Sequence, residues 1–421
     1  MRFKAYQGLL AITLLFVSSV AGWAQPDLVG SEFQVNQNRD SNQLKPVVAF
    51  SPAGHSLIVW ENDLHGIMGR FYDRNGSPMS AEITLVANQT LPSLPASGEI
   101  SIRTEPALIY LPNGEFLVFW TEERDFVSAD YFYVYREIRE QDVRGQRFSA
   151  AGKPLGASFR VNDETAGFQR RPKAALRAGG VVVVWEGGVL SGVSQSVQGR
   201  LLTRRGQAQG GEFRLDSGQA PKVRSLAVAA VPSGQAIVVW EIDHADGPNI
   251  VTRFLNQAGA PTGAEHLANM STAGRQRRPA VLATRDGNFL VAWQTNVNTT
   301  PRQHGIKGQF VSSEFTWFGP ELTFTDDGGS TQVAPALALL PSGNIVVAWS
   351  DWTDTYPLGI YALTVDPAGR PLGKKVALNK DRVYPQYQNS VAANAHGDIV
   401  AVWEGQIQRG RAIAGRRLAD D

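Results

Sequence analysis

Apolar runs that end in tryptophan recur along the chain at a nearly constant spacing. The first three occupy residues 57–60, 117–120 and 182–185, and four more end at Trp240, Trp293, Trp349 and Trp403. Successive tryptophans lie 60, 65, 55, 53, 56 and 54 residues apart, which indicates a repeated structural unit. Runs of Val, Ile and Phe that stop at Gly-containing turns are typical of buried β-strands. The pattern therefore predicts seven copies of one β unit.

Each unit contains four strand-like segments. We name strands a to d the segments of the first unit, at residues 46–50, 57–60, 66–71 and 82–86. Gly- and Pro-containing turns, at residues 52–54 and 75–78, separate a from b and c from d. Strand a is rich in alanine in later units, which suits a strand beside a crowded central axis. Seven such units predict an all-β fold, a seven-bladed β-propeller of four-stranded antiparallel blades, rather than an array of β-sandwiches.

The two ends of the chain support closure of the ring. The last unit reaches strand c at residues 412–416 and has no strand d before Asp421. Residues 32–36 have the sequence Glu-Phe-Gln-Val-Asn, which matches the strand d at residues 159–162. They are predicted to form a strand d, although no strands a to c come before them. We therefore expect the N-terminal strand to complete the last blade and to cover a sheet edge that would otherwise be exposed.

These repeats carry a resemblance to known proteins. The segments Glu-Phe-x-Val-Asn, Val-Val-Trp-Glu and Gly-x-Arg-Phe recur through nearly all of the chain after residue 24. In this the chain resembles a group of bacterial secreted proteins built from the same repeats. The resemblance implies a seven-bladed propeller and implies no particular activity.

Composition and the first residues bear on the compartment. Forty basic and 39 acidic residues give a net charge of +1, so nothing in the overall charge favours nucleic acid or an anionic membrane. The chain has no cysteine. Residues 1–24 combine Arg2, Lys4, an apolar stretch and small residues near their end, which predicts a signal peptide. The alternative, an uncleaved anchor, is disfavoured because the apolar stretch is shorter than the ~20 residues of a membrane span.

We therefore expect residues 25–421 to form one secreted or periplasmic propeller domain, monomeric and not inserted in a membrane. Loop lengths separate its two faces. Strand-a Pro and strand-b Trp lie 13 or 14 residues apart, whereas strand-b Trp and the strand-c Gly position lie 9 to 25 residues apart. We call the face with b–c and d–a connections the loop face, and the face with a–b and c–d turns the turn face. Variable loops usually carry binding residues, so we expect function on the loop face.

Aromatic residues gather in two b–c loops. The longest, predicted at residues 122–141, contains Tyr131, Tyr133 and Tyr135, and the sixth contains Trp352 and Tyr356. Such residues can form a platform for sugar rings or for a partner protein. Large exposed aromatic patches are rare on soluble monomers. The alternatives are therefore that the longest loop packs its own aromatics, or that strands b and c continue past the ring.

Charged residues gather just before strand a, where they should surround the channel mouth. The position before the strand-a Pro holds Lys45, Glu105, Arg171 and Arg278, and Arg224 stands nearby in the fourth unit. Arginine forks match carboxylate, sulfate and phosphate groups. The alternative is that these cations pair with loop acids such as Asp40, Asp163 and Glu164.

Two polar residues repeat in several units and are therefore interpreted as architectural. A Glu follows the strand-b Trp in four units, and a Gln precedes the strand-a Pro by three residues in five units. A catalytic group should instead belong to one unit. The six histidines are scattered and have no metal-ligand spacing, and no sequence motif of a known nucleophile or cofactor site is present. We expect no metal and no cofactor, and we assign no catalytic residue.

Three functions remain open on this sequence. The preferred one is a non-catalytic protein that holds a glycan or an extracellular protein on its loop face. The second is a polysaccharide hydrolase or lyase with its site at the same channel mouth, for which loop acids such as Asp125 and Asp130, or an Arg beside a Tyr, supply possible groups. The third is a structural module of a cell-surface assembly.

Overall fold

The computed structural model describes residues 26–89, 98–129, 134–188, 195–218, 222–244, 247–297, 303–325, 330–352, 359–380, 386–407 and 410–420. The predicted signal peptide lies outside them. Every regular element in these ranges is a β-strand, and 28 strands are present, β1 to β28. Within the same ranges no helix has the length and apolar character that crossing a membrane requires.

Most of the strands form four-stranded sheets in chain order. The sheet that matches the first predicted unit contains β2 (Gln43–Phe50), β3 (Ser56–Asn62), β4 (Gly66–Tyr72) and β5 (Ile83–Ala87). Three more are β14 (Val223–Ala230), β15 (Ala236–Ile242), β16 (Asn249–Leu255) and β17 (Pro261–Leu267); β18 (Arg275–Ala283), β19 (Phe289–Val297), β20 (Gln303–Val311) and β21 (Trp317–Thr323); and β22 (Thr331–Leu339), β23 (Ile345–Trp352), β24 (Gly359–Val365) and β25 (Val376–Ala377).

Two further sets of four antiparallel strands are joined at one point. They are β6 (Gly98–Tyr110), β7 (Phe116–Ala129), β8 (Val134–Phe148) and β9 (Phe159–Arg160), and β10 (Phe168–Arg177), β11 (Gly180–Gly188), β12 (Gln195–Leu202) and β13 (Phe213–Arg214). A parallel pairing of Phe168 with Gln141 connects them into a sheet of eight. At four strands each, the 28 described strands fit about seven units.

The first described strand lies beside the last, where the sequence predicts it. β1 (Asp27–Gln34) pairs antiparallel with β28 (Gly410–Ala419), which continues to β27 (Asp398–Ile407) and β26 (Gln386–Ala393). The Val35 N–H donates to the Ile413 carbonyl at 2.8 Å, and the Ile413 N–H donates to Asn36 Oδ1 at the same distance. β1 is longer than predicted, because it begins at Asp27 rather than at Glu32.

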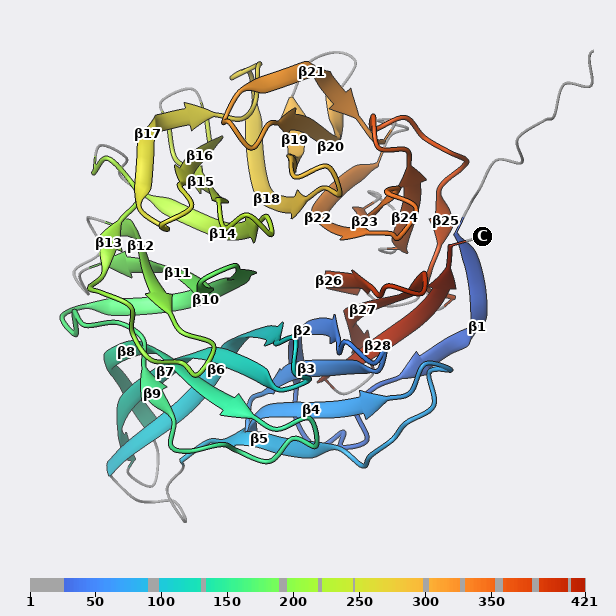
Figure 1. The fold of residues 1–421 in the computed structure, drawn as a ribbon. Coiled ribbons are helices and arrows are strands. Elements are labelled where there is room, and N and C mark those ends of the chain that lie inside the picture. Colours follow the sequence, from blue (N-terminus) through green and yellow to red (C-terminus); the bar gives the residue numbers. More distant parts are fainter. Residues whose placement is uncertain are drawn as a thin grey trace, which may run out of the picture.

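The sheets surround a common centre (Figure 1). We call β2, β6, β10, β14, β18, β22 and β26 the inner strands, because each is the first of its set. Each inner strand contacts the next, and β26 contacts β2. The seven repeated tryptophans are at most 1% exposed and fill the cores between adjacent sheets. One such core joins Trp60 of β3 to Val402 of β27 and to Val35, which follows β1.

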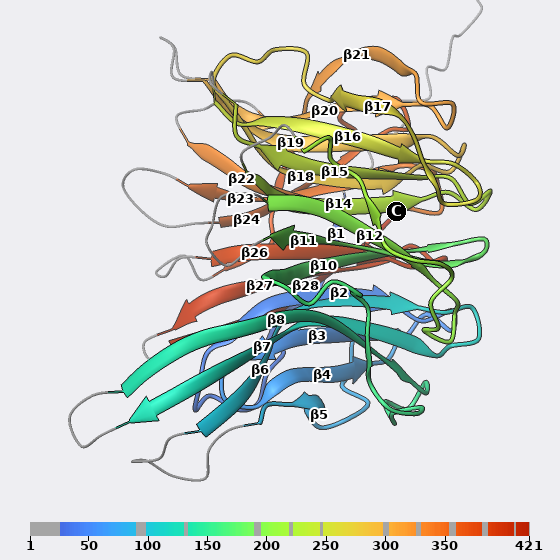
Figure 2. The same ribbon diagram turned by 90° about the vertical axis from the view of Figure 1, so that its left-hand side faces the viewer.

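The prediction of a long loop at residues 122–141 is wrong. β7 runs to Ala129 and β8 starts at Val134, so strands b and c continue past the other sheets, as one of the two alternatives proposed. Figure 2 shows β6, β7 and β8 projecting beyond their neighbours. Two cross-strand contacts link the strands of this extension. Arg124 Nη1 forms an ion pair with Glu140 Oε2 at 3.0 Å, and the Arg139 guanidinium makes a cation–π contact 4.4 Å from the centre of the Phe126 ring.

Candidate functional site

Six of the seven inner strands share a strained residue near one end. Positive φ angles of 50–60° occur at Lys45, Glu105, Arg171, Ser225, Arg278 and Ala334. In each of these strands the ladder to the next strand shifts register at that point, which makes a β-bulge. Left-handed backbone is unfavourable for residues other than glycine, so the surrounding structure must hold it. These positions are those that the sequence predicts around the channel mouth.

The repeated glutamates hold this backbone, which confirms their architectural interpretation. Glu61 Oε2 accepts the Glu105 N–H at 3.0 Å, and Glu186 Oε1 accepts the Ser225 N–H at 3.1 Å. Glu404 and Glu241 do the same for the next inner strands, β2 and β18. The strand β7 has a threonine after its Trp instead. There Thr121 Oγ1 accepts the Arg171 N–H at 2.9 Å, and Glu105 Oε2 accepts the same N–H at 3.2 Å.

Three of the five repeated glutamines bind a buried tryptophan, whereas the indole N–H groups of Trp349 and Trp403 have no hydrogen bond among the described residues. Gln43 Oε1 accepts the indole N–H of Trp60 at 2.7 Å, while its Nε2 donates to the Ser41 carbonyl at 3.1 Å. Gln169 and Gln276 accept from the Trp of their own sheets in the same way. These glutamines therefore tie the buried tryptophan to the loop before the inner strand.

Replacing Gln43 with Val should lower the free energy of unfolding by about 1–3 kcal/mol, because the buried N–H donors of Trp60 and Asn62 lose their acceptor. The fold itself should survive. The β14 strand has Val223 at the equivalent place, and there the Trp240 indole N–H has no hydrogen bond among the described residues. Urea unfolding of the wild type and of Gln43→Val measures the difference, and an unchanged midpoint would contradict the role assigned to Gln43.

Three of the predicted site residues form one network of charges. Lys45 Nζ lies 3.1 Å from Glu61 Oε2 and 3.6 Å from Glu105 Oε1. Arg171 Nε lies 3.0 Å from Glu105 Oε1, and Arg171 Nη1 lies 3.1 Å from Glu186 Oε2. The cations are therefore paired, as the alternative proposed, but not with Asp40, Asp163 or Glu164. Their partners are Glu105 and the architectural glutamates.

This network borders a pocket of about 330 Å³, which we call the mouth pocket. It is lined by Lys45, Glu61, Asp63, Ile102, Thr104, Glu105, Glu123, Gln141, Arg170 and Arg171. Two predicted residues are not part of it. Arg224 pairs with Asp243 at 2.6 Å, and the Arg278 side chain has neither an ion pair nor a hydrogen bond within the described part of the chain.

The pKa values of Glu105 and Glu186 shift in opposite directions although Arg171 bridges the two carboxylates. Burial raises the pKa of Glu105, but the charges of Lys45 and Arg171 and their hydrogen bonds outweigh it, so that the pKa is lowered. Burial also raises the pKa of Glu186, and there Arg171 and Arg170 do not overcome it. The Glu186 side chain is 0% exposed, whereas 17% of the Glu105 side chain is exposed. Glu105 is therefore the ionised acceptor that a ligand can reach.

Sequence analysis missed Lys173, which lies two residues after Arg171 on β10. Its Cα pairs with Val184, the residue before the strand-b Trp. The residues at this register in the other inner strands are small or apolar: Val47, Ala107, Ala227, Ala280, Ala336 and Ser390. Comparing the strands residue by residue would have found this single charge. The Lys173 side chain is exposed. The surrounding protein still displaces part of the water around the ammonium, which lowers the pKa of Lys173, and the charges of Glu105 and Glu186 only partly oppose this lowering.

Most of the predicted aromatic platform falls outside the described residues. Tyr131, Tyr133 and Tyr356 lie outside the described residues. Tyr135 lies on β8 and pairs with Ser128, and Trp352 lies on β23 and pairs with Thr331, but only their backbone positions are described.

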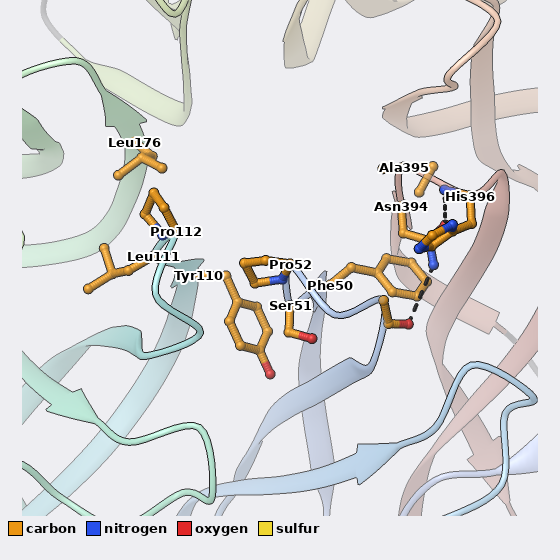
Figure 3. A pocket seen from close by; sticks show the side chains of 12 residues that line it. Phe50, Ser51, Pro52, Tyr110, Leu111, Pro112, Leu176, Asn394, Ala395 and His396 are labelled. Carbon is orange, nitrogen blue, oxygen red and sulfur yellow. Dashed lines mark hydrogen bonds between the residues drawn. The ribbon is translucent and has the colours of Figure 1, made fainter.

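A second cavity, of about 280 Å³, lies on the turn face at the other end of the inner strands (Figure 3). Its walls are mostly apolar and include Phe50, Tyr110, Leu111, Leu176 and the prolines of two a–b turns, and His396 stands at its rim. Burial raises the pKa of Tyr110. Among the described residues no group of three or more His, Asp or Glu side chains is arranged to hold a metal ion.

Comparison with known proteins shows a fold and no family. No protein-family model matches the chain, and no curated protein matches it. A protein of unknown function from Dyadobacter fermentans is 10% identical, with a TM-score of 0.54 over 94% of this chain and 99% of that one. A polysaccharide lyase, an ulvan lyase bound to GlcA(1-4)Rha3S, is 9% identical, with a TM-score of 0.58 over 92% and 96% of the two chains. At such identities the likeness concerns the fold alone, which is that of a β-propeller.

Proposed function

We propose that the chain is a secreted, seven-bladed β-propeller, residues 25–421, that holds a carbohydrate in the mouth pocket. Three observations support the closed ring. The 28 described strands divide into sets of four, β1 pairs with β28, and the core around Trp60 joins the first sheet to the last. In this architecture β1 is the fourth strand of the last blade, and it leaves that blade without a free edge.

The observation that carries the functional proposal is the network around Glu105. Sugar hydroxyls donate and accept hydrogen bonds, so a sugar site needs both kinds of partner within one small pocket. The mouth pocket offers carboxylate acceptors in Glu105, Glu123 and Asp63 and cationic donors in Lys45 and Arg171. Hydrogen bonds to charged groups are the stronger ones. The ion pairs fix Glu105 before any ligand arrives, which reduces the entropy cost of binding.

Charge also argues against acid catalysis in this pocket. A glycosidase needs a carboxylic acid with a raised pKa beside a second carboxyl group. Lys45 contacts both Glu61 and Glu105, so the two carboxylates are close, but the pKa of Glu105 is lowered. Glu186 has the raised pKa and is inaccessible. The ulvan lyase shows that a similar fold can act on a polysaccharide, so the comparisons give no support to the non-catalytic reading, and catalysis must be measured directly.

The test is binding of residues 25–421 to an array of neutral and acidic polysaccharides. Arg171→Ala should weaken binding roughly tenfold or more, because it removes a charge-assisted hydrogen bond from the pocket. The matched control is Lys153→Ala, which removes an exposed cation from a turn on the opposite face. Equal affinity of Arg171→Ala and the wild type, or no binding to any polysaccharide at micromolar protein, would overturn the proposal. Reducing-end and unsaturated-product assays on each bound polysaccharide then decide between binder and enzyme.

A further inference from the structure

We propose that Lys173 is an oxyanion subsite beside the mouth pocket: it lies two residues along β10 from Arg171, which lines the pocket, and it holds a carboxylate or sulfate group of a sugar that extends from the pocket. This inference rests on the proposed function and specifies the class of its ligand. Lys173 is the charged member of a register that is otherwise small or apolar in the inner strands, so the repeat architecture gives no reason for it. A charge found in one blade only is what a site requires.

The charges around Lys173 leave it without a partner of its own. Lys45, Arg170 and Arg171 pair with Glu61, Glu105 and Glu186, each carboxylate lying within 3.6 Å of at least one of these cations. No carboxylate lies within ion-pair distance of Lys173 in the described part of the chain. These three cations and three acids pair with one another, and Asp63 and Glu123 also line the pocket. Lys173 is the cation of this group that has no ion pair among the described residues.

Because Lys173 is exposed and has no carboxylate partner, an anionic group of a ligand can reach its ammonium and form a charge-assisted hydrogen bond with it. The groups that act on Lys173 come from four strands: Lys45 on β2, Glu105 on β6, Arg171 on β10 and Glu186 on β11. Glu105 and Glu186 oppose the lowering of its pKa, and Arg171 and Lys45 add to it. A bound oxyanion favours the charged form, so it should raise the pKa of Lys173, and binding should take up protons wherever the free amine is partly neutral.

Two sugar substituents share this chemistry, the carboxylate of a uronic acid and a sulfate ester. The experiment uses oligoglucuronate, its carboxyl-reduced neutral form, and a sulfated glucan with its desulfated form, each titrated calorimetrically into the wild type, Lys173→Ala, Lys173→Arg and the control Lys153→Ala. Lys173→Ala should lose affinity roughly tenfold or more for one acidic sugar and none for its neutral form, and Lys173→Arg should recover part of the loss. Which acidic sugar responds identifies the substituent. Equal losses for acidic and neutral sugars would overturn the inference while leaving the proposed function intact.

A second measurement keeps the inference testable if no sugar binds, which would be a failure of the proposed function instead. Inorganic sulfate is titrated into protein with ¹⁵N-labelled lysine, and the Lys173 ammonium is followed by NMR as a function of pH, with Lys173→Arg used to assign its signal. A sulfate-dependent rise in the pKa of Lys173, absent for Lys153, supports the subsite. A Lys173 pKa that does not respond to sulfate overturns it.

Discussion

Deletion of residues 26–36 is expected to lower the free energy of unfolding by about 5 kcal/mol or more. The deletion removes Val35, which is 0% exposed in the core with Trp60 and Val402, and it removes Phe33 from its contact with Tyr72. Each buried apolar side chain of this size contributes about 1.5–3 kcal/mol, and each lost ladder hydrogen bond adds about 0.5–1.5 kcal/mol. The freed edge of β28 should also make the shortened protein associate with itself.

Equilibrium urea unfolding measures the first effect, and analytical ultracentrifugation measures the second. The matched control is deletion of residues 26–28 alone, which removes only the start of β1, where Leu28 is 42% exposed. Because that short deletion leaves Phe33, Val35 and Asn36 in place, it should change stability little. If the long deletion unfolds at the midpoint of the wild type, β1 does not close the ring.

Glu105→Gln is expected to weaken carbohydrate binding in the mouth pocket roughly a hundredfold. Glu105 is the shared partner of Lys45 and Arg171, and it also accepts from Thr121 Oγ1 at 3.0 Å and from the Arg171 N–H. Glutamine keeps the shape but not the charge, so Lys45 and Arg171 each lose one of their two carboxylate partners, and the pocket loses the carboxylate that both cations hold in place. Breaking a buried ion pair costs about 3–5 kcal/mol, and the partial exposure of Glu105 places this case below that range.

The same variant gives a pH signature. The pKa of Glu105 is lowered from 4.5 in the folded protein. At a given pH near this value, the carboxyl group therefore binds fewer protons in the folded state than in the unfolded chain. The stabilisation is therefore fully present above pH 4.5 and disappears as the pH falls through the folded pKa. Below pH 4.5 the wild type should lose stability more steeply than Glu105→Gln, and the exposed-site control Glu314→Gln should follow the wild type. Parallel curves for wild type and Glu105→Gln would show that Glu105 is not held by its cations.

The repeat pattern was sufficient to predict the sheets because every repeat buries the same kind of residue, a tryptophan and the apolar run before it, against a neighbouring sheet. A Trp ends every predicted strand b and is buried between sheets, and the residues before it form a continuous apolar run because these strands, such as β3 and β11, are buried on both faces. The pairing of β1 with β28 could be predicted because the last repeat lacks a strand d and residues 32–36 have the sequence of a strand d. Residues 122–141 were misread because loop length was inferred from spacing alone. The alternating charges that pair Arg124 with Glu140 carry a strand signal, which identifies the extension.

The sequence grouped three residues that the structure brings together, Lys45, Glu105 and Arg171, but it did not show which further carboxylates these cations pair with. The sequence placed Lys45, Glu105 and Arg171 at the mouth, since they precede strand a in consecutive units. It did not show that the repeated glutamates reach the next blade, because a contact between Glu186 and Arg171 depends on how the sheets pack. For the same reason it grouped Arg278 with Arg171, although Arg278 does not line the mouth pocket. Lys173 was overlooked because it lies inside an apolar strand, where a charge was not sought.

The most direct test of the central claim is a crystal structure of residues 25–421 with the polysaccharide fragment that binds most tightly. The account predicts a sugar in the mouth pocket, with a hydroxyl within hydrogen-bond distance of Glu105 and another of Arg171. A sugar bound instead in the turn-face cavity beside Tyr110 and His396, with the mouth pocket empty, would contradict it.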